Sequence, residues 1–132
     1  MIVCPLDVSD FRHTCAVIVS GDKGNPCGHA LLHLGDAWYF HVAGFYKLPK
    51  YMHEDGYRRY MRENNKREIR RRPIRLPNPR GAHEKLDELL AKKWLWGIVV
   101  NNCTSFVEEI VQAGGSNAYQ MFNCPSAEPF AP

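Results

Sequence analysis

The chain has 132 residues, 45% of them hydrophobic and 23% charged, and its formal net charge is +3. This length fits one globular domain and suffices to bury a hydrophobic core. The composition excludes a disordered or collagen-like chain. No apolar run approaches the roughly 20 residues of a membrane-spanning helix, so we expect no transmembrane segment. The N-terminal sequence lacks the basic and apolar stretches of a signal peptide, so we expect synthesis in the cytoplasm, with export only by a dedicated secretion system.

Positive charge is concentrated in one segment of the chain. Residues 58–80 contain ten Lys or Arg against two Glu, a balance of +8, and the remainder of the chain carries −5. Such a run attracts anionic partners over a distance, whereas the simpler interpretation is a solvated basic face. Tyr57 and Tyr60 interleave with the charges, but no RNA- or DNA-binding motif is present, so we do not expect a nucleic-acid partner.

Five cysteines occur at positions 4, 15, 27, 103 and 124. The number is odd and no two have the CxxC spacing, which argues against a zinc ribbon and against a complete disulfide framework. Without a signal peptide we expect these thiols to be reduced. A reactive cysteine is then the alternative to consider.

The first elements in chain order are short strands. Residues 1–14 lead in irregularly, residues 15–20 are an apolar run typical of a buried strand, and residues 21–26 indicate a loop. Two further apolar runs, 28–34 and 38–42, flank Gly35-Asp36-Ala37 and predict a β-hairpin. Residues 47–80 are polar, basic and interrupted by four prolines. We expect a basic insertion or long connection there, in which 57–70 can form an exposed helix.

Helical periodicity begins near residue 82, where an apolar stripe recurs at helical spacing at Leu86, Leu89, Leu90 and Trp94. Residues 97–100 indicate a short buried strand. Residues 103–113 predict a second amphipathic helix, which ends at Gly114-Gly115, and an irregular tail follows. The chain therefore predicts one small α+β domain over residues 1–132, in which a small antiparallel sheet packs against helices.

Cys103 is the most distinctive candidate for chemistry. It falls where the predicted strand 97–100 turns into a helix, among free backbone N–H groups at the positive end of the helix dipole. That setting favours the thiolate, which is the nucleophilic form, and the same N–H groups can stabilise an oxyanion. A buried structural cysteine is the alternative reading of this position.

A cysteine nucleophile needs a base, usually a histidine that a third group orients. If Gly35-Asp36-Ala37 is a three-residue loop, Leu34 pairs with Trp38, and strand alternation then places His29, His33 and His41 on one face. His29 and His41 become diagonal neighbours in this register. A two-residue loop would break the parity.

A zinc site is a second interpretation of the same region. Cys27, His29, His33 and His41 include side chains that bind zinc, but their spacing matches no familiar zinc signature, and we expect neither a metal nor a cofactor.

Two stretches, Gly28-His29-Ala-Leu-Leu-His-Leu-Gly35-Asp36 followed by His41, and Asn102-Cys103-Thr-Ser-Phe106-Val107, resemble one family. It is the circularly permuted branch of the papain-like, NlpC-type cysteine hydrolases, which includes the lecithin:retinol acyltransferase-like proteins. The resemblance covers residues 14–44 and 94–115, and it implies a permuted papain-like fold. It implies Cys103 as nucleophile, His29 as base and His41 as the orienting third member.

The family implies acyl transfer from an amide or ester carbonyl. The backbone N–H of Cys103, with Asn102 in support, would stabilise the oxyanion, and Trp38 and Tyr39 would line the substrate site. The chain departs from the acyltransferase-like members because the Glu-His pair that often follows their cysteine is missing, and because there is no C-terminal hydrophobic anchor.

Three classes of function remain open. The first is a cysteine amidase or peptidase that cleaves peptidoglycan, as a cell-wall hydrolase or as a delivered toxin with a cognate inhibitor protein. The second is a lipid or thioester acyl hydrolase or transferase, with a basic patch that favours anionic membranes. The third is a non-catalytic binding module that uses the basic segment 58–80.

Overall fold

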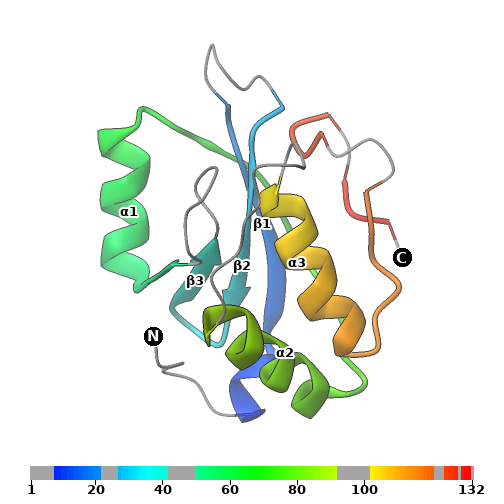
Figure 1. The fold of residues 1–132 in the computed structure, drawn as a ribbon. Helices are drawn as coiled ribbons and strands as arrows, with labels where there is room; N and C mark the ends of the chain where they lie inside the picture. Colours follow the sequence, from blue (N-terminus) through cyan, green and yellow to red (C-terminus); the bar gives the residue numbers. More distant parts are fainter. Residues whose placement is uncertain are drawn as a thin grey trace.

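The structure, a computed structural model, describes residues 8–21, 27–41, 50–91, 102–120, 124–127 and 129–131, excluding the side chains of Lys50, Ala91, Asn102 and Cys103. The chain forms an α+β domain whose elements are drawn in Figure 1. They are η1 (Val8–Arg12), β1 (Thr14–Val19), β2 (His29–Leu34), β3 (Trp38–His41), β4 (Lys50–Met52), α1 (Glu54–Glu63), β5 (Glu68–Pro73), α2 (Pro79–Ala91) and α3 (Asn102–Ala113).

The five strands form one antiparallel sheet in the order β4-β3-β2-β1-β5. The predicted strands at 15–20, 28–34 and 38–42 are confirmed, and every end lies within one residue of the prediction. A short 3-10 helix, η1, replaces part of the irregular lead-in. The predicted strand at 97–100 and Trp94 lie outside the described residues.

The β2–β3 hairpin has the register that the sequence predicted. Leu34 pairs with Trp38 across a three-residue turn, and Gly35 has φ of 64°, a left-handed value that glycine adopts without strain. The Gly35 N–H donates to the carbonyl oxygens of Asp10 and His13, both at 3.0 Å. The turn is therefore held by η1, and the parity of β2 against β3 is fixed.

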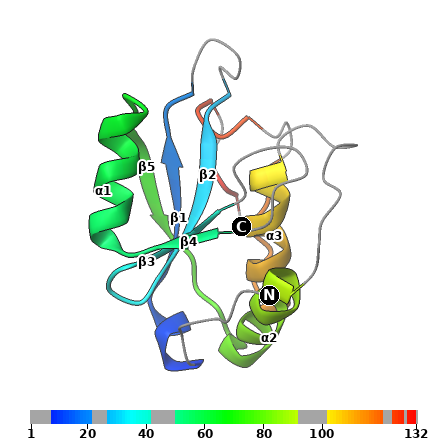
Figure 2. The same ribbon diagram turned by 60° about the vertical axis from the view of Figure 1, so that its left-hand side comes forward.

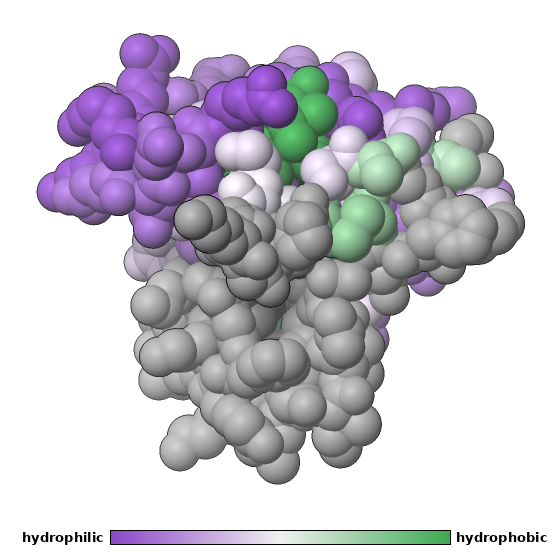
Figure 3. All heavy atoms as spheres, turned by 90° about the horizontal axis from the view of Figure 1, so that it is seen from above, coloured by the Kyte–Doolittle hydropathy of each residue, from purple (hydrophilic) through white to green (hydrophobic). Residues whose placement is uncertain are grey.

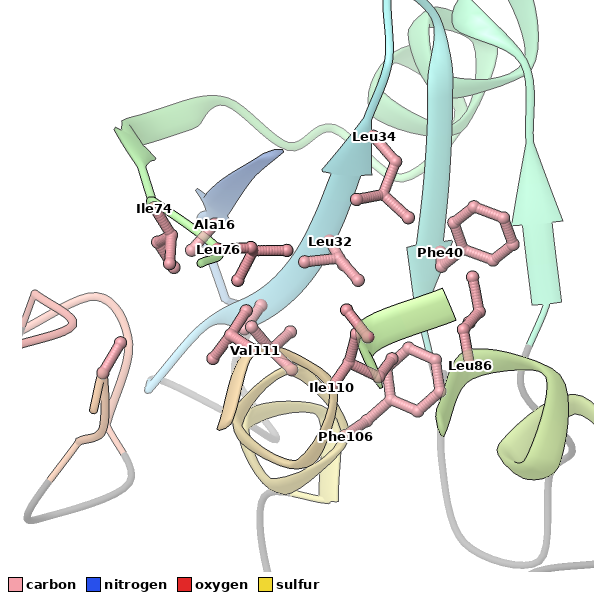
Figure 4. Close-up of a cluster of buried hydrophobic side chains, with 14 of the residues drawn as sticks. Ala16, Leu32, Leu34, Phe40, Ile74, Leu76, Leu86, Phe106, Ile110 and Val111 are labelled. Atoms are coloured by element: carbon pink, nitrogen blue, oxygen red, sulfur yellow. The ribbon is translucent and has the colours of Figure 1, made fainter. Parts of the chain in front are cut away.

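One face of the sheet packs against α2 and α3. Leu32 and Phe40 point from β2 and β3 toward Phe106 and Ile110 of α3, as Figure 4 shows, and all four side chains are fully buried. The predicted inner stripe of α3 is therefore confirmed. The stripe of α2 is confirmed at Leu86, Leu89 and Leu90, and α2 begins three residues before Ala82.

The opposite face is covered by α1, so the sheet lies between two helical layers (Figure 2). Val17, Leu31 and Tyr39 of the sheet form a second, smaller cluster with Tyr57 of α1. The rings of Tyr39 and Tyr57 stack with centroids 3.9 Å apart and an angle of 6° between their planes. The face covered by α1 is also the face that carries His29 and His33 of β2.

The basic segment contributes directly to the sheet. The sequence suggested a connection with a helix inside 57–70, but the helix α1 spans Glu54–Glu63 and residues 68–73 form β5. Both β4 and β5 are edge strands. The arginines and Pro73 make β5 look unlike a strand in the sequence. Such residues are typical of edge strands, where they prevent pairing with other chains.

The expectation of reduced thiols is wrong for two of the five cysteines. Cys27 and Cys124 form a disulfide, which ties the residue before Gly28 to the C-terminal segment. Ser126 donates its N–H to the Cys27 carbonyl at 2.9 Å, and Arg70 donates to the carbonyls of Pro125 and Ser126. The tail is therefore attached to the start of β2. Among the described helices, none has the length and apolar character that crossing a bilayer requires.

Candidate functional site

His29 and His41 form a hydrogen-bonded pair. His29 is the first residue of β2 and His41 the last of β3, and their ring nitrogens, Nε2 of His29 and Nδ1 of His41, lie 3.0 Å apart. Both side chains are buried, at 9% and 5% exposure. The predicted diagonal contact is therefore confirmed, and its cause is the three-residue turn that sets the register.

The environment keeps His29 neutral. Burial, then the neighbouring His41 and then Lys66 lower the pKa of His29 to about 3. In the hydrogen bond between the two rings one nitrogen donates and the other accepts, and the tautomer decides which does so. If Nε2 of His29 donates to His41, its Nδ1 carries a free lone pair. His29 then has the tautomer that a general base requires.

Both rings lie on the α1 face of the sheet. His29 is the Cα partner of Val19, which belongs to the cluster under α1, and the ring of His41 packs edge-on against Tyr60 of α1 at 5.4 Å. Lys66, which follows α1, donates from Nζ to the Ser20 carbonyl at 3.0 Å, next to the end of β1. The basic segment therefore returns to the same end of the sheet as His29.

Cys103 lies in the first turn of α3, as predicted, with Asn102 as the first residue of that helix. The start of α3 points to the end of the molecule where β2 begins, in both ribbon views (Figures 1 and 2). However, α3 packs on the sheet face opposite α1, through Phe106 and Ile110. The structure thus joins the two histidines and places the cysteine helix across the sheet from them. The Cys103 and Asn102 side chains are outside the described part of the chain.

The two predicted substrate residues differ in their accessibility. Trp38 is partly exposed and makes edge contacts with the rings of Tyr51 and His53. Tyr39 is fully buried beneath α1 and its hydroxyl donates to Glu54 at 3.0 Å. Tyr39 has no surface open to a substrate in this arrangement, so of the two only Trp38 is accessible.

The residues of the alternative zinc site do not meet in one place. The Cys27 sulfur is used in the disulfide, and His33 is directed to Arg71, whose Nη1 lies 3.4 Å from its Nδ1. Within the described ranges, no group of three or more His, Cys, Asp or Glu residues could hold a metal ion.

The structure contains an ion-pair network beneath α1 that the sequence pattern does not predict. Arg71 donates to both carboxylate oxygens of Glu68 and, at 2.8 Å, to the Tyr39 hydroxyl, while Tyr57 donates to Glu68 at 2.7 Å. The composition of the basic segment does not distinguish Arg71 from its neighbouring arginines. The signal that could have separated Arg71 is the alternation of β5, which turns it inward while Arg70 and Arg72 face the other way.

The molecule carries a basic surface at the end where His29 lies. Arg58, Arg59 and Arg62 share the outer stripe of α1, and Arg67 follows near Ser20. Figure 3 looks down on this end and shows hydrophilic side chains gathered on the α1 side. Arg59, Arg62 and Arg67 have no ion-pair partner within the described residues.

Comparisons with protein-family models, curated proteins and solved structures found no match.

Proposed function

We propose that the chain is a cysteine-dependent amidase or peptidase with a permuted papain-like arrangement, acting on peptidoglycan peptides. The observation that carries the proposal is the buried His29–His41 hydrogen bond of 3.0 Å, at the end of the sheet where the helix that contains Cys103 begins. A buried histidine pair with one ring kept neutral has no evident purpose in packing, whereas it suits a base and its orienting partner.

The roles follow from the ring nitrogens. We assign His29 as the donor in the hydrogen bond between its Nε2 and Nδ1 of His41, which leaves Nδ1 of His29 as the atom that takes a proton. Nδ1 accepts the thiol proton of Cys103 as the sulfur attacks the carbonyl carbon, and backbone N–H groups of the first turn of α3 stabilise the oxyanion. The imidazolium then protonates the leaving amine. Water, deprotonated by the same nitrogen, releases the acyl group and restores the thiol.

The low pKa of His29 selects between two versions of this mechanism. A resting thiolate–imidazolium pair requires a protonated His29, and burial disfavours that form. We therefore assign His29 the role of general base during attack on the thiol, and not that of a partner in a resting thiolate–imidazolium pair.

The arrangement of elements sets a geometric requirement. Because α3 and the two imidazoles lie on opposite faces, the Cys103 sulfur must reach Nδ1 of His29 around the start of β2. The reaction would take place at this end of the sheet, beside Lys66 and Arg67. These cations favour an anionic substrate, and the carboxylate-bearing peptides of a cell wall fit that charge.

The test is digestion of purified peptidoglycan, with mass analysis of the released fragments. We expect fragments from the wild type and none from Cys103→Ala or His29→Ala. Cys4→Ala and His13→Ala are the matched controls and should digest as the wild type does; His13 is exposed and lies at the other end of the sheet. Undiminished release by Cys103→Ala would refute the nucleophile. Release of fatty acid from ester or thioester lipids, without peptidoglycan fragments, would show that the protein is a lipid or thioester acyl hydrolase instead.

A second candidate function is a non-catalytic binding module, which the separation of α3 from the histidines favours. The unpaired arginines of α1 would then be the functional residues. Its signature is binding of a polyanion that weakens steeply with salt. Fluorescence anisotropy with labelled single-stranded DNA measures this, and no binding at low salt would dismiss the candidate.

A further inference from the structure

A cavity of about 650 Å³ lies at the opposite end of β2 from His29. Residues of η1, the start of β1, the end of β2 and the segment after β5 surround it. Its floor is apolar and includes Phe11, Ile74 and Leu76. This volume is typical of sites for small ligands, which combine apolar walls with a few polar groups.

The polar groups that line this cavity are cationic or neutral. Arg12 and Arg75 are exposed and belong to the lining, together with His13 and His33. Neither arginine has an ion-pair partner within the described residues. Asp10 approaches Gly35 nearby, but no acidic residue is part of the lining. The cavity therefore has two available guanidinium groups beside an apolar floor.

His33 contributes its imidazole ring to the wall. Its side chain is 8% exposed, and its Nδ1 lies 3.4 Å from Arg71 Nη1. Because a guanidinium only donates, Nδ1 accepts and the ring proton of a neutral His33 is on Nε2. That Nε2 is buried and has no partner at standard geometry, but the ring interacts with the backbone of Asp36. His33 therefore shapes the wall, and no ligand contact is assigned to it.

Cys15 provides a reporter inside the same cavity. It is the Cα partner of His33, lines the cavity, and is half-buried with a free thiol. Burial raises the pKa of this thiol, with a smaller opposing effect from Arg71. Cys15 therefore rests as a thiol, and its reactivity reports on access to the cavity.

We propose that this cavity binds a small organic anion, in which a carboxylate or phosphate contacts Arg12 and Arg75 and an apolar portion lies on Phe11, Ile74 and Leu76. The cavity is separate from the proposed hydrolase site, because the two lie at opposite ends of β2. It does not depend on the hydrolase proposal.

The test uses phenyl phosphate as probe, with phenol and inorganic phosphate as partial probes, in isothermal titration calorimetry. We expect phenyl phosphate to bind at least ten times more tightly than either partial probe. Arg75→Ala should weaken its binding about tenfold or more, whereas Lys85→Ala, on α2 and outside the cavity lining, should not. Equal affinity in Arg75→Ala and Lys85→Ala would overturn the proposal.

Alkylation of Cys15 gives an independent readout, followed by peptide mass analysis. Iodoacetate, which is anionic, should react faster relative to neutral iodoacetamide in the wild type than in Arg12→Ala/Arg75→Ala. Phenyl phosphate should slow both reagents. A reagent ratio that is unchanged in the double variant, with no protection by phenyl phosphate, would show that the cavity does not select anions.

Discussion

The pairing of His29 with His41 shows how a polar group is accommodated beneath a helix. Each imidazole is almost fully buried, and each uses the other as a hydrogen-bond partner at 3.0 Å. A buried polar group without a partner costs more than a satisfied one gains. The two residues are therefore energetically coupled, and removing one affects the other.

Substitution of His41 tests this coupling. In His41→Ala we expect the free energy of unfolding to fall by about 1–3 kcal/mol, because Nε2 of His29 loses its partner. If His29 is the base, kcat on a peptidoglycan peptide should also fall, because the ring is no longer oriented. His41→Asn, which can still accept a hydrogen bond, should recover part of kcat.

Urea unfolding and steady-state kinetics provide the measurements. His53→Ala serves as the control, since His53 is exposed and precedes α1. If His41→Ala and His53→Ala have the same stability, the histidine pair is not a coupled unit.

Among the elements, β5 contributes to the attachment of α1 to the sheet. The register between β1 and β5 shifts between Ile18 and Val19, and this lets Glu68 and Arg71 face the same side although they are three residues apart. Arg71 then connects Glu68 to Tyr39, and through Tyr39 to Glu54 of α1. Arg71 therefore links β5 to β3 and, through Tyr39, to α1.

Arg71→Met should lower the free energy of unfolding by about 1–2 kcal/mol, because Glu68 and the Tyr39 hydroxyl lose a donor while the side-chain volume is kept. The Arg71 side chain is 33% exposed, so solvent screening limits the effect. Arg72→Met is the matched control on the same strand, with its side chain on the other sheet face. Urea unfolding of both variants measures the difference. Equal stabilities would show that the network does not fasten α1.

The sequence predicted the features that short-range geometry determines, such as the turn and register of the β2–β3 hairpin. The Gly35-Asp36-Ala37 turn fixed the parity of the hairpin, and the contact of His29 with His41 followed from it. The edge strand β5 was missed because its consecutive arginines obscure the alternation of the strand. The side of the sheet on which α3 packs could not be derived from the motif around Cys103, because long-range packing of Phe106 and Ile110 decides it.

At the scale of the molecule, the C-terminal segment is attached to the start of β2. The Cys27–Cys124 disulfide joins residues 97 positions apart, and Arg70 holds the carbonyls of the turn that follows. Gly28 has φ of 79°, and a Cβ there would lie 2.6 Å from the Val19 carbonyl oxygen. A glycine is therefore required between the disulfide and His29, and the approach of the tail to β2 depends on it.

Acid should destabilise the whole molecule through its buried histidines. Burial lowers the pKa of His29 to about 3 in the native state, whereas histidine in an unfolded chain titrates near about 6.5. Between these values the unfolded chain binds a proton that the native protein does not. The free energy of unfolding therefore falls as the pH drops below about 6.5, by up to about 1 kcal/mol per pH unit for one such group. Burial and Arg71 lower the pKa of His33, which acts in the same direction.

The dependence on His29 is tested by urea unfolding at pH values from about 7 down to about 4.5, where the linkage predicts the largest change. In His29→Gln the loss of stability with falling pH should be shallower than in the wild type, by up to about 1 kcal/mol per pH unit. His53→Gln is the control and should keep the wild-type slope. Parallel curves for His29→Gln and the wild type would show that His29 takes up a proton in the native state as readily as in the unfolded chain. In that case the neutral general base that we assign to His29 would be wrong.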